Sequence, residues 1–282
     1  MPLKVAAITM IYNEPEYLPI WLKYYSSQLG YQNCFVLDHG SDDDCTRDIS
    51  CGGVFHLPRT PQDENKRVDT ISNIVNSLLN YYDVVIYSDV DEIIVPNPSV
   101  FGGIADFCAS MSDPVITAVG LNVHHLVDVE PELDLSKPIL LQRHWVRFVS
   151  PMCKPIITRV PIRWGRGFHS SNHPLVFGDI YLFHLRYFDL KIGLDRLNRT
   201  RVLTRASEGD IRAAQHQRIA DEEYEGMMRS VSKMSKEMKP LSVSEVPLKP
   251  YLDQCVDDMG KVNLNTFANV LWPIPVEFSE VF

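Results

Sequence analysis

The sequence lacks the features that mark several large classes of protein. Its 282 residues contain no apolar run long enough to cross a bilayer, and the longest runs, such as Val84–Tyr87, have the length of strands. There is no internal repeat and no low-complexity tract. The six cysteines show no C-x-x-C spacing, so neither a zinc site nor a disulfide scaffold is indicated. A formal net charge of -9 argues against a general nucleic-acid binder, which usually carries a basic face.

The first residues give no targeting signal. Met1-Pro2-Leu3-Lys4-Val5 runs directly into a strand-like segment, so we expect no signal peptide and no transmembrane segment. Free thiols then fit a reducing compartment, and we expect a cytoplasmic protein that is able to make peripheral membrane contact. An acidic protein can still bind a diphosphate, because a bound divalent cation supplies the positive charge locally.

Alternating strand and helix patterns predict an α/β fold. The segments 3–10, 33–37, 53–57 and 83–88 read as strands, and 17–29 and 64–80 as helices with one apolar face. This alternation predicts a single domain with a mostly parallel central sheet and helices on both faces. The second half reads as strands over 114–125, 139–148, 154–160 and 179–187, followed by a charged helical extension. We expect one domain over residues 1–240, with residues 241–282 as a tail packed on it.

Two carboxylates follow the most apolar strand. Asp83 to Ser88 is almost entirely apolar and β-branched, as in a central strand, and it leads into Asp89-Val90-Asp91-Glu92. Ligands of such sheets collect outside the carboxyl ends of the strands. If the chain turns there, Asp89 and Asp91 can both reach one Mg²⁺ or Mn²⁺ ion, since these ions prefer oxygen ligands and bridge phosphates. An acidic turn that only ends the strand is the alternative.

A second polar group follows the first two strands. We expect a nucleoside to lie there, and a carboxylate such as Asp38 can accept the imide N–H of a uracil ring. Helix capping by Asn13 and Glu14 and an Asx-type turn at Asp38 are the alternative interpretation. The residues that we assign to this pocket are Ile11, Asn13, Glu14, Asp38 and Ser41.

Three ordered motifs resemble the family-2-type glycosyltransferases of the GT-A fold, over roughly residues 3 to 190. One branch of that family reads "NE-x-x-Y/F-L-x-x-W-x-x-Y/H-x-x-x-G" near its start, "D-x-G-S-x-D" after the second strand, and "D-x-D-E-I/F-I/L-x-P" in the middle. This chain matches them with Asn13-Glu14 through Gly30, with Asp38 to Asp43, and with Asp89 to Pro96.

The resemblance implies a nucleotide-diphospho-sugar donor, usually a UDP- or GDP-sugar, and a hydroxyl acceptor on a glycan or another molecule. It also implies a metal held by Asp89 and Asp91, and many such enzymes add a late histidine. His184 is the best-placed match, and His169 is its competitor. We expect an inverting, hexosyltransferase-like enzyme.

The general base stays open at this point. Asp91 and Glu92 lie beside the expected reaction centre, and His169 has suitable chemistry because its ordinary pKa lies near neutral. Asp179 and Asp189 are further options. Cations that can pair with the diphosphate are expected among Lys66, Arg67, Lys154, Arg163 and Arg166.

Two other classes of function compete with this interpretation. A haloacid-type phosphatase also uses D-x-D after an apolar strand, but it places the motif on its first strand and wants Thr or Val where this chain has Ile93. A non-catalytic nucleotide- or carbohydrate-binding module on the same fold is the second. Donor hydrolysis with and without Mn²⁺ separates the three.

Overall fold

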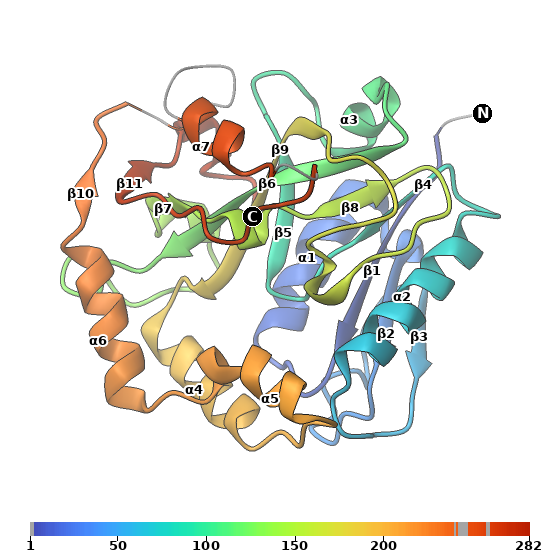
Figure 1. Ribbon diagram of the computed structural model, residues 1–282, viewed down its shortest axis with the longest axis horizontal. Coiled ribbons are helices and arrows are strands. Elements are labelled where there is room, and N and C mark those ends of the chain that lie inside the picture. Colours follow the sequence, from blue (N-terminus) through green and yellow to red (C-terminus); the bar gives the residue numbers. More distant parts are fainter. Residues whose placement is uncertain (1–2, 240, 242–247, 258–259) are drawn as a thin grey trace.

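The structure is a computed structural model that describes residues 3–239, 241, 248–257 and 260–282. Its strands and helices follow the chain in an alternating order through the first half (Figure 1). The strands are β1 (Val5–Ile11), β2 (Cys34–Asp38), β3 (Gly53–His56), β4 (Val84–Tyr87), β5 (Glu92–Pro96), β6 (Val115–His124), β7 (Trp145–Phe148), β8 (Pro155–Thr158), β9 (Phe177–Tyr187), β10 (Ser235–Lys236) and β11 (Val270–Pro273). The helices are α1 (Tyr17–Leu29), α2 (Glu64–Leu78), α3 (Ile104–Ser110), α4 (Leu190–Arg201), α5 (Glu208–Ala213), α6 (Asp221–Ser232) and α7 (Lys249–Gln254).

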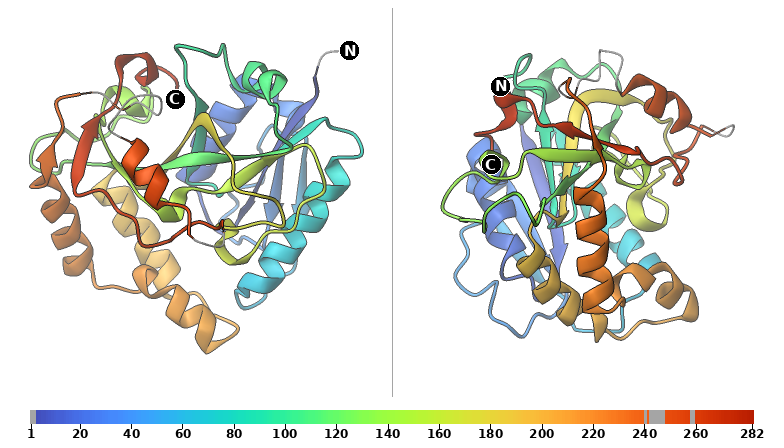
Figure 2. Two further views of the ribbon diagram at one scale, coloured as in Figure 1. Left: turned by 45° about the horizontal axis from the view of Figure 1, so that its top comes forward. Right: turned by 90° about the vertical axis from the view of Figure 1, so that its left-hand side faces the viewer.

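One sheet runs through the molecule in the order β10-β11-β7-β6-β8-β4-β1-β2-β3, and β9 joins it by pairing with β6 and β5. The strands β3, β2, β1 and β4 pair in parallel. Beyond β4 the pairing turns antiparallel through β8, although β6 and β9 are again parallel. Helices α1 and α2 cover opposite faces of the parallel strands (Figure 2). The predicted α/β class with a helix-covered central sheet is confirmed.

The carboxyl ends of the parallel strands share one edge of the sheet. In Figure 1 these strands point toward the bottom of the molecule, where α4 and α5 lie. The antiparallel strands arise where sequence patterns indicated a strand-rich second half. The predicted strand 139–148 is shorter, because residues 139–141 form a 3₁₀ turn and only β7 joins the sheet.

The last part of the chain adds to the same sheet. β11 pairs antiparallel with β7, and β10 pairs in parallel with β11. The predicted boundary at residue 240 lies outside the described residues, so the division of the chain there stays a prediction. Among the described residues no helix is long and apolar enough to span a membrane.

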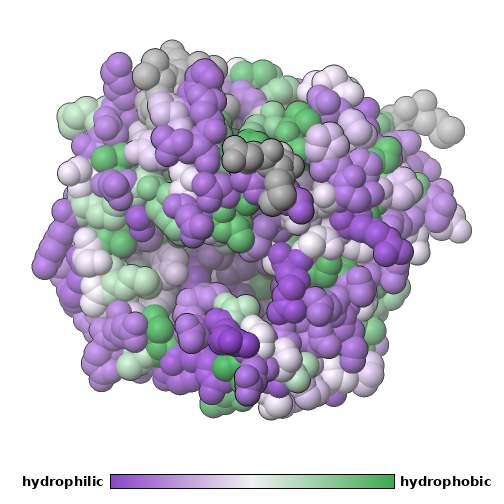
Figure 3. Space-filling view, viewed as in Figure 1, coloured by the Kyte–Doolittle hydropathy of each residue, from purple (hydrophilic) through white to green (hydrophobic). Residues whose placement is uncertain are grey.

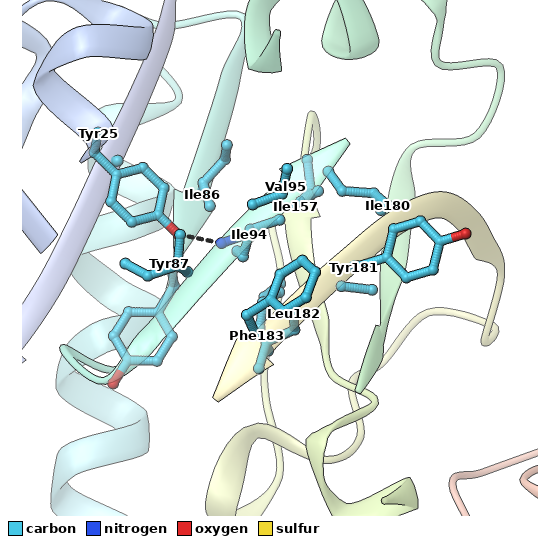
Figure 4. Packing of buried hydrophobic residues seen from close by; sticks show 14 of the residues in the cluster. Tyr25, Ile86, Tyr87, Ile94, Val95, Ile157, Ile180, Tyr181, Leu182 and Phe183 are labelled. Carbon is cyan, nitrogen blue, oxygen red and sulfur yellow. Dashed lines mark hydrogen bonds between the residues drawn. The ribbon is translucent and has the colours of Figure 1, made fainter. Parts of the chain in front are cut away.

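The aromatic face of α1 anchors the turn that follows β4. The Trp21 indole donates to the Ser88 hydroxyl at 2.8 Å, and the Tyr24 hydroxyl donates to the Ile94 carbonyl at 2.7 Å. The Tyr25 hydroxyl accepts from the Ile94 amide at 3.1 Å, a bond drawn in Figure 4 among the buried residues of β4, β5 and β9. Both strands that flank Asp89 and Asp91 are therefore held by one helix.

A close backbone approach at Gly120 positions the segment that leads into β8. A β-carbon at Gly120 would lie 2.3 Å from the Met152 carbonyl carbon and 2.6 Å from the Cys153 amide nitrogen. The Gly120 amide also donates to the Cys153 sulfur at 3.3 Å. Lys154 follows directly, and its carbonyl accepts from the Ala118 amide at 3.1 Å.

We predict that Gly120→Ala lowers the free energy of unfolding by about 1–3 kcal/mol, because backbone atoms that cannot rotate away must shift. Gly226 in α6 is the matched control, since a β-carbon there meets nothing within 4 Å. Gly226→Ala should instead stabilise by about 0.5–1 kcal/mol. Denaturant titration of both variants measures this, and equal effects of the two would contradict the close approach at Gly120.

Candidate functional site

A tight turn after β4 brings the two predicted carboxylates to the same edge. The Glu92 amide donates to the Asp89 carbonyl at 2.9 Å, and the Asp89 amide donates to the Glu92 carboxylate at 3.2 Å. β5 then starts at Glu92 and pairs with β9, which places Glu92 opposite His184. The turn therefore satisfies the condition under which Asp89 and Asp91 can face one site.

Asp89 lies between two cations. Arg67 of α2 contacts one carboxylate oxygen, and the Lys154 ammonium lies 3.0 Å from the other. The Tyr87 hydroxyl donates to the same carboxylate at 2.6 Å. Burial alone would raise the pKa of Asp89, but Arg67 and Lys154 outweigh it and lower the pKa below its ordinary value. Asp89 therefore stays ionised at neutral pH.

Asp91 is shared by Arg196 and His184. Arg196 of α4 contacts one Asp91 oxygen, and His184 Nε2 lies 3.2 Å from the same oxygen. The Nδ1 atom of His184 lies 2.8 Å from the Asn122 amide oxygen, an arrangement that orients the ring with Nε2 toward Asp91. Burial would raise the pKa of Asp91, but Arg196 and His184 outweigh it and hold the pKa well below its ordinary value.

Three glutamates complete the charged group. Glu92 is 1% exposed and lies 2.5 Å from the Lys154 ammonium. One Glu14 oxygen accepts from Arg196 at 2.7 and 3.0 Å, whereas the other is buried with no partner among the described residues. Burial raises the pKa of both Glu14 and Glu92. Glu64 adds a further carboxylate, 3.1 Å from Arg67.

His169 lies at the border of this group. Burial, followed by the nearby Lys154 ammonium, lowers the pKa of His169 to about 4, so the imidazole is neutral at pH 7. The Pro151 backbone accepts a hydrogen bond from the ring, and Nδ1 has no partner among the described residues.

The predicted nucleoside residues form the neighbouring corner, at the ends of β1 and β2. Asn13 does not cap α1. Its φ is 51°, and its side chain bonds Asp42 through both the amide nitrogen, at 2.6 Å, and the oxygen, at 3.0 Å. The Asn13 amide donates to the Ser41 hydroxyl at 3.0 Å, while the Ile11 side chain is buried in the core. These contacts tie β1 to the loop after β2.

Asp38 braces that loop. Its carboxylate accepts from the Ser41 amide at 2.8 Å and from the Thr46 hydroxyl at 3.1 Å, and His56 Nδ1 lies 3.2 Å away. Asp38 is 2% exposed. Its contacts in this structure are thus with the protein itself, and its predicted contact with a base stays a prediction.

A cavity of about 460 Å³ lies beside this corner. It is lined by Tyr12, Asn13, Arg59, Thr60, Pro61, Arg199, Thr200, Val202, Leu203 and Thr204. The Arg59 guanidinium stacks on the Tyr12 ring, 3.6 Å from its centroid. Among the described residues no carboxylate lines the cavity, and its walls come from the end of β1, the segment after β3 and the end of α4. The face in Figure 3 is hollowed near its centre, above α4 and α5, with hydrophilic side chains around much of the hollow.

Several residues of this region escaped the sequence analysis. Arg196 and Arg199 lie on α4, and they pair with Glu14 and Glu16 of the β1–α1 connection. The available signal was that the two arginines are three residues apart on a predicted helix after His184, a spacing that places both on one face of the helix. Of the predicted cations, Lys154 and Arg67 reach the carboxylates, whereas Arg166 pairs with Asp210 and is half exposed.

The described residues contain no group of three or more His, Cys, Asp or Glu side chains placed to hold a metal ion. Asp91 and His184 make a pair, and any further ligand would have to come from a bound molecule or from water.

Comparison with known proteins yields only weak structural similarity. No protein-family model matches the sequence, and no curated protein is significantly similar to it. A mannosyltransferase from Pyrobaculum calidifontis, in complex with GDP-Man and Mn²⁺, is 16% identical over 44% of this chain and 36% of its own, with a TM-score of 0.29. A cytidylyltransferase from Leptospira borgpetersenii is 12% identical over 41% of this chain and 54% of its own, with a TM-score of 0.26.

A mannose-1-phosphate geranyltransferase from Thermus thermophilus is 10% identical, over 96% of this chain and 74% of its own, with a TM-score of 0.31. The matched parts cover less than two thirds of the first two proteins. At these TM-scores the similarities carry no argument about function.

We predict that Asp38→Asn lowers the free energy of unfolding by about 1–3 kcal/mol at pH 7, since the loop loses hydrogen bonds to a charged acceptor. Burial would raise the pKa of Asp38, but the bonds from Ser41, Thr46 and His56 hold it below 3.8. A lowered folded-state pKa gives stability above the unfolded value that is lost as the pH falls. The difference between variant and wild type should therefore shrink below about pH 4.

Denaturant titrations at pH 7 and pH 3 measure this difference. Asp43→Asn is the matched control, because Asp43 lies in the same loop but is exposed, and its side chain bonds the nearby Cys45 through the backbone amide, at 3.1 Å, and the thiol. A pH-independent deficit in Asp38→Asn would show that the ionised carboxylate is not what braces the loop.

Proposed function

We propose that this protein is a metal-dependent glycosyltransferase that uses a nucleotide-diphospho-sugar donor. The observation that carries the proposal is the pairing of Asp91 with His184 at the carboxyl edge of the parallel strands. Arg196, which contacts the same Asp91 oxygen, lies one helical turn along α4 from Arg199 in the wall of the 460 Å³ cavity. Such an edge is where α/β sheets bind their ligands. The three motifs that resemble family-2-type glycosyltransferases begin at this edge, with Asn13 after β1, Asp38 at the end of β2 and Asp89 after β4.

The residues present fit a divalent cation. Two neighbouring ligand atoms around an octahedral ion, each about 2.1 Å from the ion, lie about 3 Å from each other. The Asp91 carboxylate oxygen and His184 Nε2 are 3.2 Å apart. When all are ionised, the five carboxylates Glu14, Glu64, Asp89, Asp91 and Glu92 face the three cations Arg67, Lys154 and Arg196. That leaves two negative charges, the amount that one divalent cation balances.

In this proposal Asp91 and His184 hold the ion, with Asp89 beside it. An imidazole ligand favours Mn²⁺ over Mg²⁺. The bound ion would neutralise charge on the departing diphosphate. Arg67 and Lys154 keep Asp89 ionised and ordered, and the cavity accepts the nucleoside, with Tyr12 available for stacking.

His169 is our candidate for the group that takes the proton of the acceptor hydroxyl. Glu92 is engaged by Lys154 and by the Asp89 amide, so it has no open oxygen directed at a substrate. His169 is neutral and has an unpartnered Nδ1 atom. Direct attack of the acceptor oxygen on the anomeric carbon would invert its configuration. The sugar and the acceptor, a glycan or another hydroxyl compound, are left open.

The phosphatase alternative is disfavoured by topology. The D-x-D carboxylates follow β4, whereas a haloacid-type phosphatase carries them after its first strand. A binding module without catalysis predicts donor binding without turnover, and the next experiment tests it.

We predict that wild-type protein hydrolyses or transfers from a UDP- or GDP-sugar only with Mn²⁺ or Mg²⁺, and that Asp91→Asn lowers the rate by about a hundredfold or more. Asp106→Asn, in α3 and outside the charged group, is the control and should match wild type. Initial rates with and without chelator give the answer. Turnover that survives in Asp91→Asn would refute the metal role of this carboxylate.

We also predict that His184→Ala weakens Mn²⁺ binding by about tenfold or more, whereas His169→Ala leaves it near the wild-type value. The reason is that, of these two histidines, only His184 contacts an oxygen of Asp91. Titration of Mn²⁺ by electron paramagnetic resonance measures the free ion directly. A loss confined to His169→Ala would reverse the two roles, and no loss in either would remove histidine from the metal shell.

A further inference from the structure

Arg196 has an unusual position for a residue on a charged helix. Its side chain is 15% exposed, and its guanidinium bonds Asp91 on one side and Glu14 on the other. It also lies over the Tyr17 ring, 4.4 Å from the centroid. The guanidinium thus separates two carboxylates that come from the β1–α1 connection and the turn after β4.

Polar groups around Arg196 lack partners. Among the described residues, the second Glu14 oxygen and the Tyr17 hydroxyl are both buried without a hydrogen bond. Glu14 is 7% exposed and Tyr17 is fully buried. The Glu14 oxygen can be satisfied only by a donor or a cation, so the Arg196 guanidinium and the Tyr17 hydroxyl are the groups here that can donate to an anion.

The backbone that carries Arg196 is firmly held. The Asp189 side chain caps α4 by accepting from the Ile192 amide at 3.0 Å. The fully buried Arg143 donates to the other Asp189 oxygen at 2.9 Å and to the Phe188 carbonyl at 2.5 Å. The guanidinium can therefore rotate away from Asp91 without the helix moving.

A cation at Asp91 and His184 would compete with Arg196. His184 Nε2 and the Arg196 guanidinium contact the same Asp91 oxygen. An ion bound to that oxygen would lie next to the guanidinium and repel it. Arg196 would then keep Glu14 but direct its freed N–H groups toward whatever the ion binds. A diphosphate bridging the ion presents oxygens there, and a guanidinium fork matches phosphate geometry.

The position of the cavity indicates how a bound nucleotide would lie relative to Arg196. Arg199 and Thr200 line it, and Arg199 is one helical turn from Arg196, about 5 Å along the axis. A nucleoside in the cavity would place its phosphates along this face of α4, first past Arg199 and then at Arg196.

We propose that Arg196 binds the diphosphate of the donor, exchanging its contact with Asp91 for phosphate oxygens when the metal is bound. This inference rests on the proposed function. It assigns a donor-binding role to a residue outside the three motifs.

The test uses calorimetry on the full chain with Mn²⁺, with UDP, GDP, UMP and GMP as probes. Arg196→Gln should weaken binding of the preferred nucleoside diphosphate by about ten- to a hundredfold, while binding of the matching monophosphate changes by less than about threefold. Arg201→Lys is the control, because Arg201 is on the same helix but pairs with Asp221 and lines no part of the cavity.

A second measurement, of Mn²⁺ affinity, is expected not to show this loss. Without nucleotide, Arg196→Gln should bind Mn²⁺ as tightly as wild type or more tightly, since a competitor for Asp91 is gone. Arg196→Lys, which keeps the charge but loses the fork, replaces it if the glutamine variant does not fold. This variant should also weaken diphosphate binding, while Mn²⁺ binding stays near the wild-type value because the charge that competes for Asp91 is retained.

Three results would overturn the proposal. Unchanged diphosphate affinity would remove Arg196 from the donor site, and a parallel loss of monophosphate and Mn²⁺ binding would show that Arg196 is only structural. If wild-type protein binds none of the four nucleotides with Mn²⁺, the proposed function fails and this inference fails with it.

Discussion

The neutralisation of buried carboxylates is the constraint on which the rest of this structure depends. Asp89, Asp91 and Glu92 lie in the turn that follows a central strand, where Asp91 and Glu92 are 5% and 1% exposed and the Asp89 side chain is 22% exposed. Isolated charges in such a place would be costly, so each needs a cation held in position. Arg67, Lys154 and Arg196 come from α2, the start of β8 and α4, and their convergence ties three distant parts of the chain to one point.

The supporting structure makes sense in this light. α1 holds both strands that flank the carboxylates through Trp21, Tyr24 and Tyr25. Gly120 lets the segment before Lys154 approach β6 closely, and the buried Arg143–Asp189 pair fixes the start of α4. Each of these contacts supports a segment that carries a charged residue of the site. These contacts fix the backbone positions from which the charged side chains extend, so a side chain can exchange one contact for another without moving the backbone.

Much of this could be predicted from sequence, because the relevant signals are local. The apolar run of β4 followed by two aspartates identifies a strand end, and helix periodicity identifies α1 and its buried face. Lys154 and Arg67 could be named as candidate cations of the site by their place in the chain, although their pairing with Asp89 and Glu92 was not predicted. The mixed pairing beyond β4 could not, since antiparallel and parallel strands of this length carry similar patterns.

Arg196 and Asp38 show the limits of local signals most clearly. An arginine on a charged helix reads as solvated surface, and only the packing of α4 against the β1–α1 connection brings it to Asp91. The pattern around Asp38 predicts a polar turn, but it does not say whether the carboxylate faces a ligand or its own loop. Both questions depend on where distant segments meet, which no window of sequence contains.

The same constraint explains how a site filled with ion pairs can still bind a charged ligand. Desolvation offsets most of the attraction in a buried ion pair, so exchanging one partner for another of equal charge costs little. A divalent ion bound to Asp91 and a diphosphate bound to Arg196 would replace the single Asp91–Arg196 ion pair with two ion pairs, each between opposite charges. The ion pairs seen around Arg196 are then compatible with binding, because they hold each group ionised and near its position until the ligand replaces one contact.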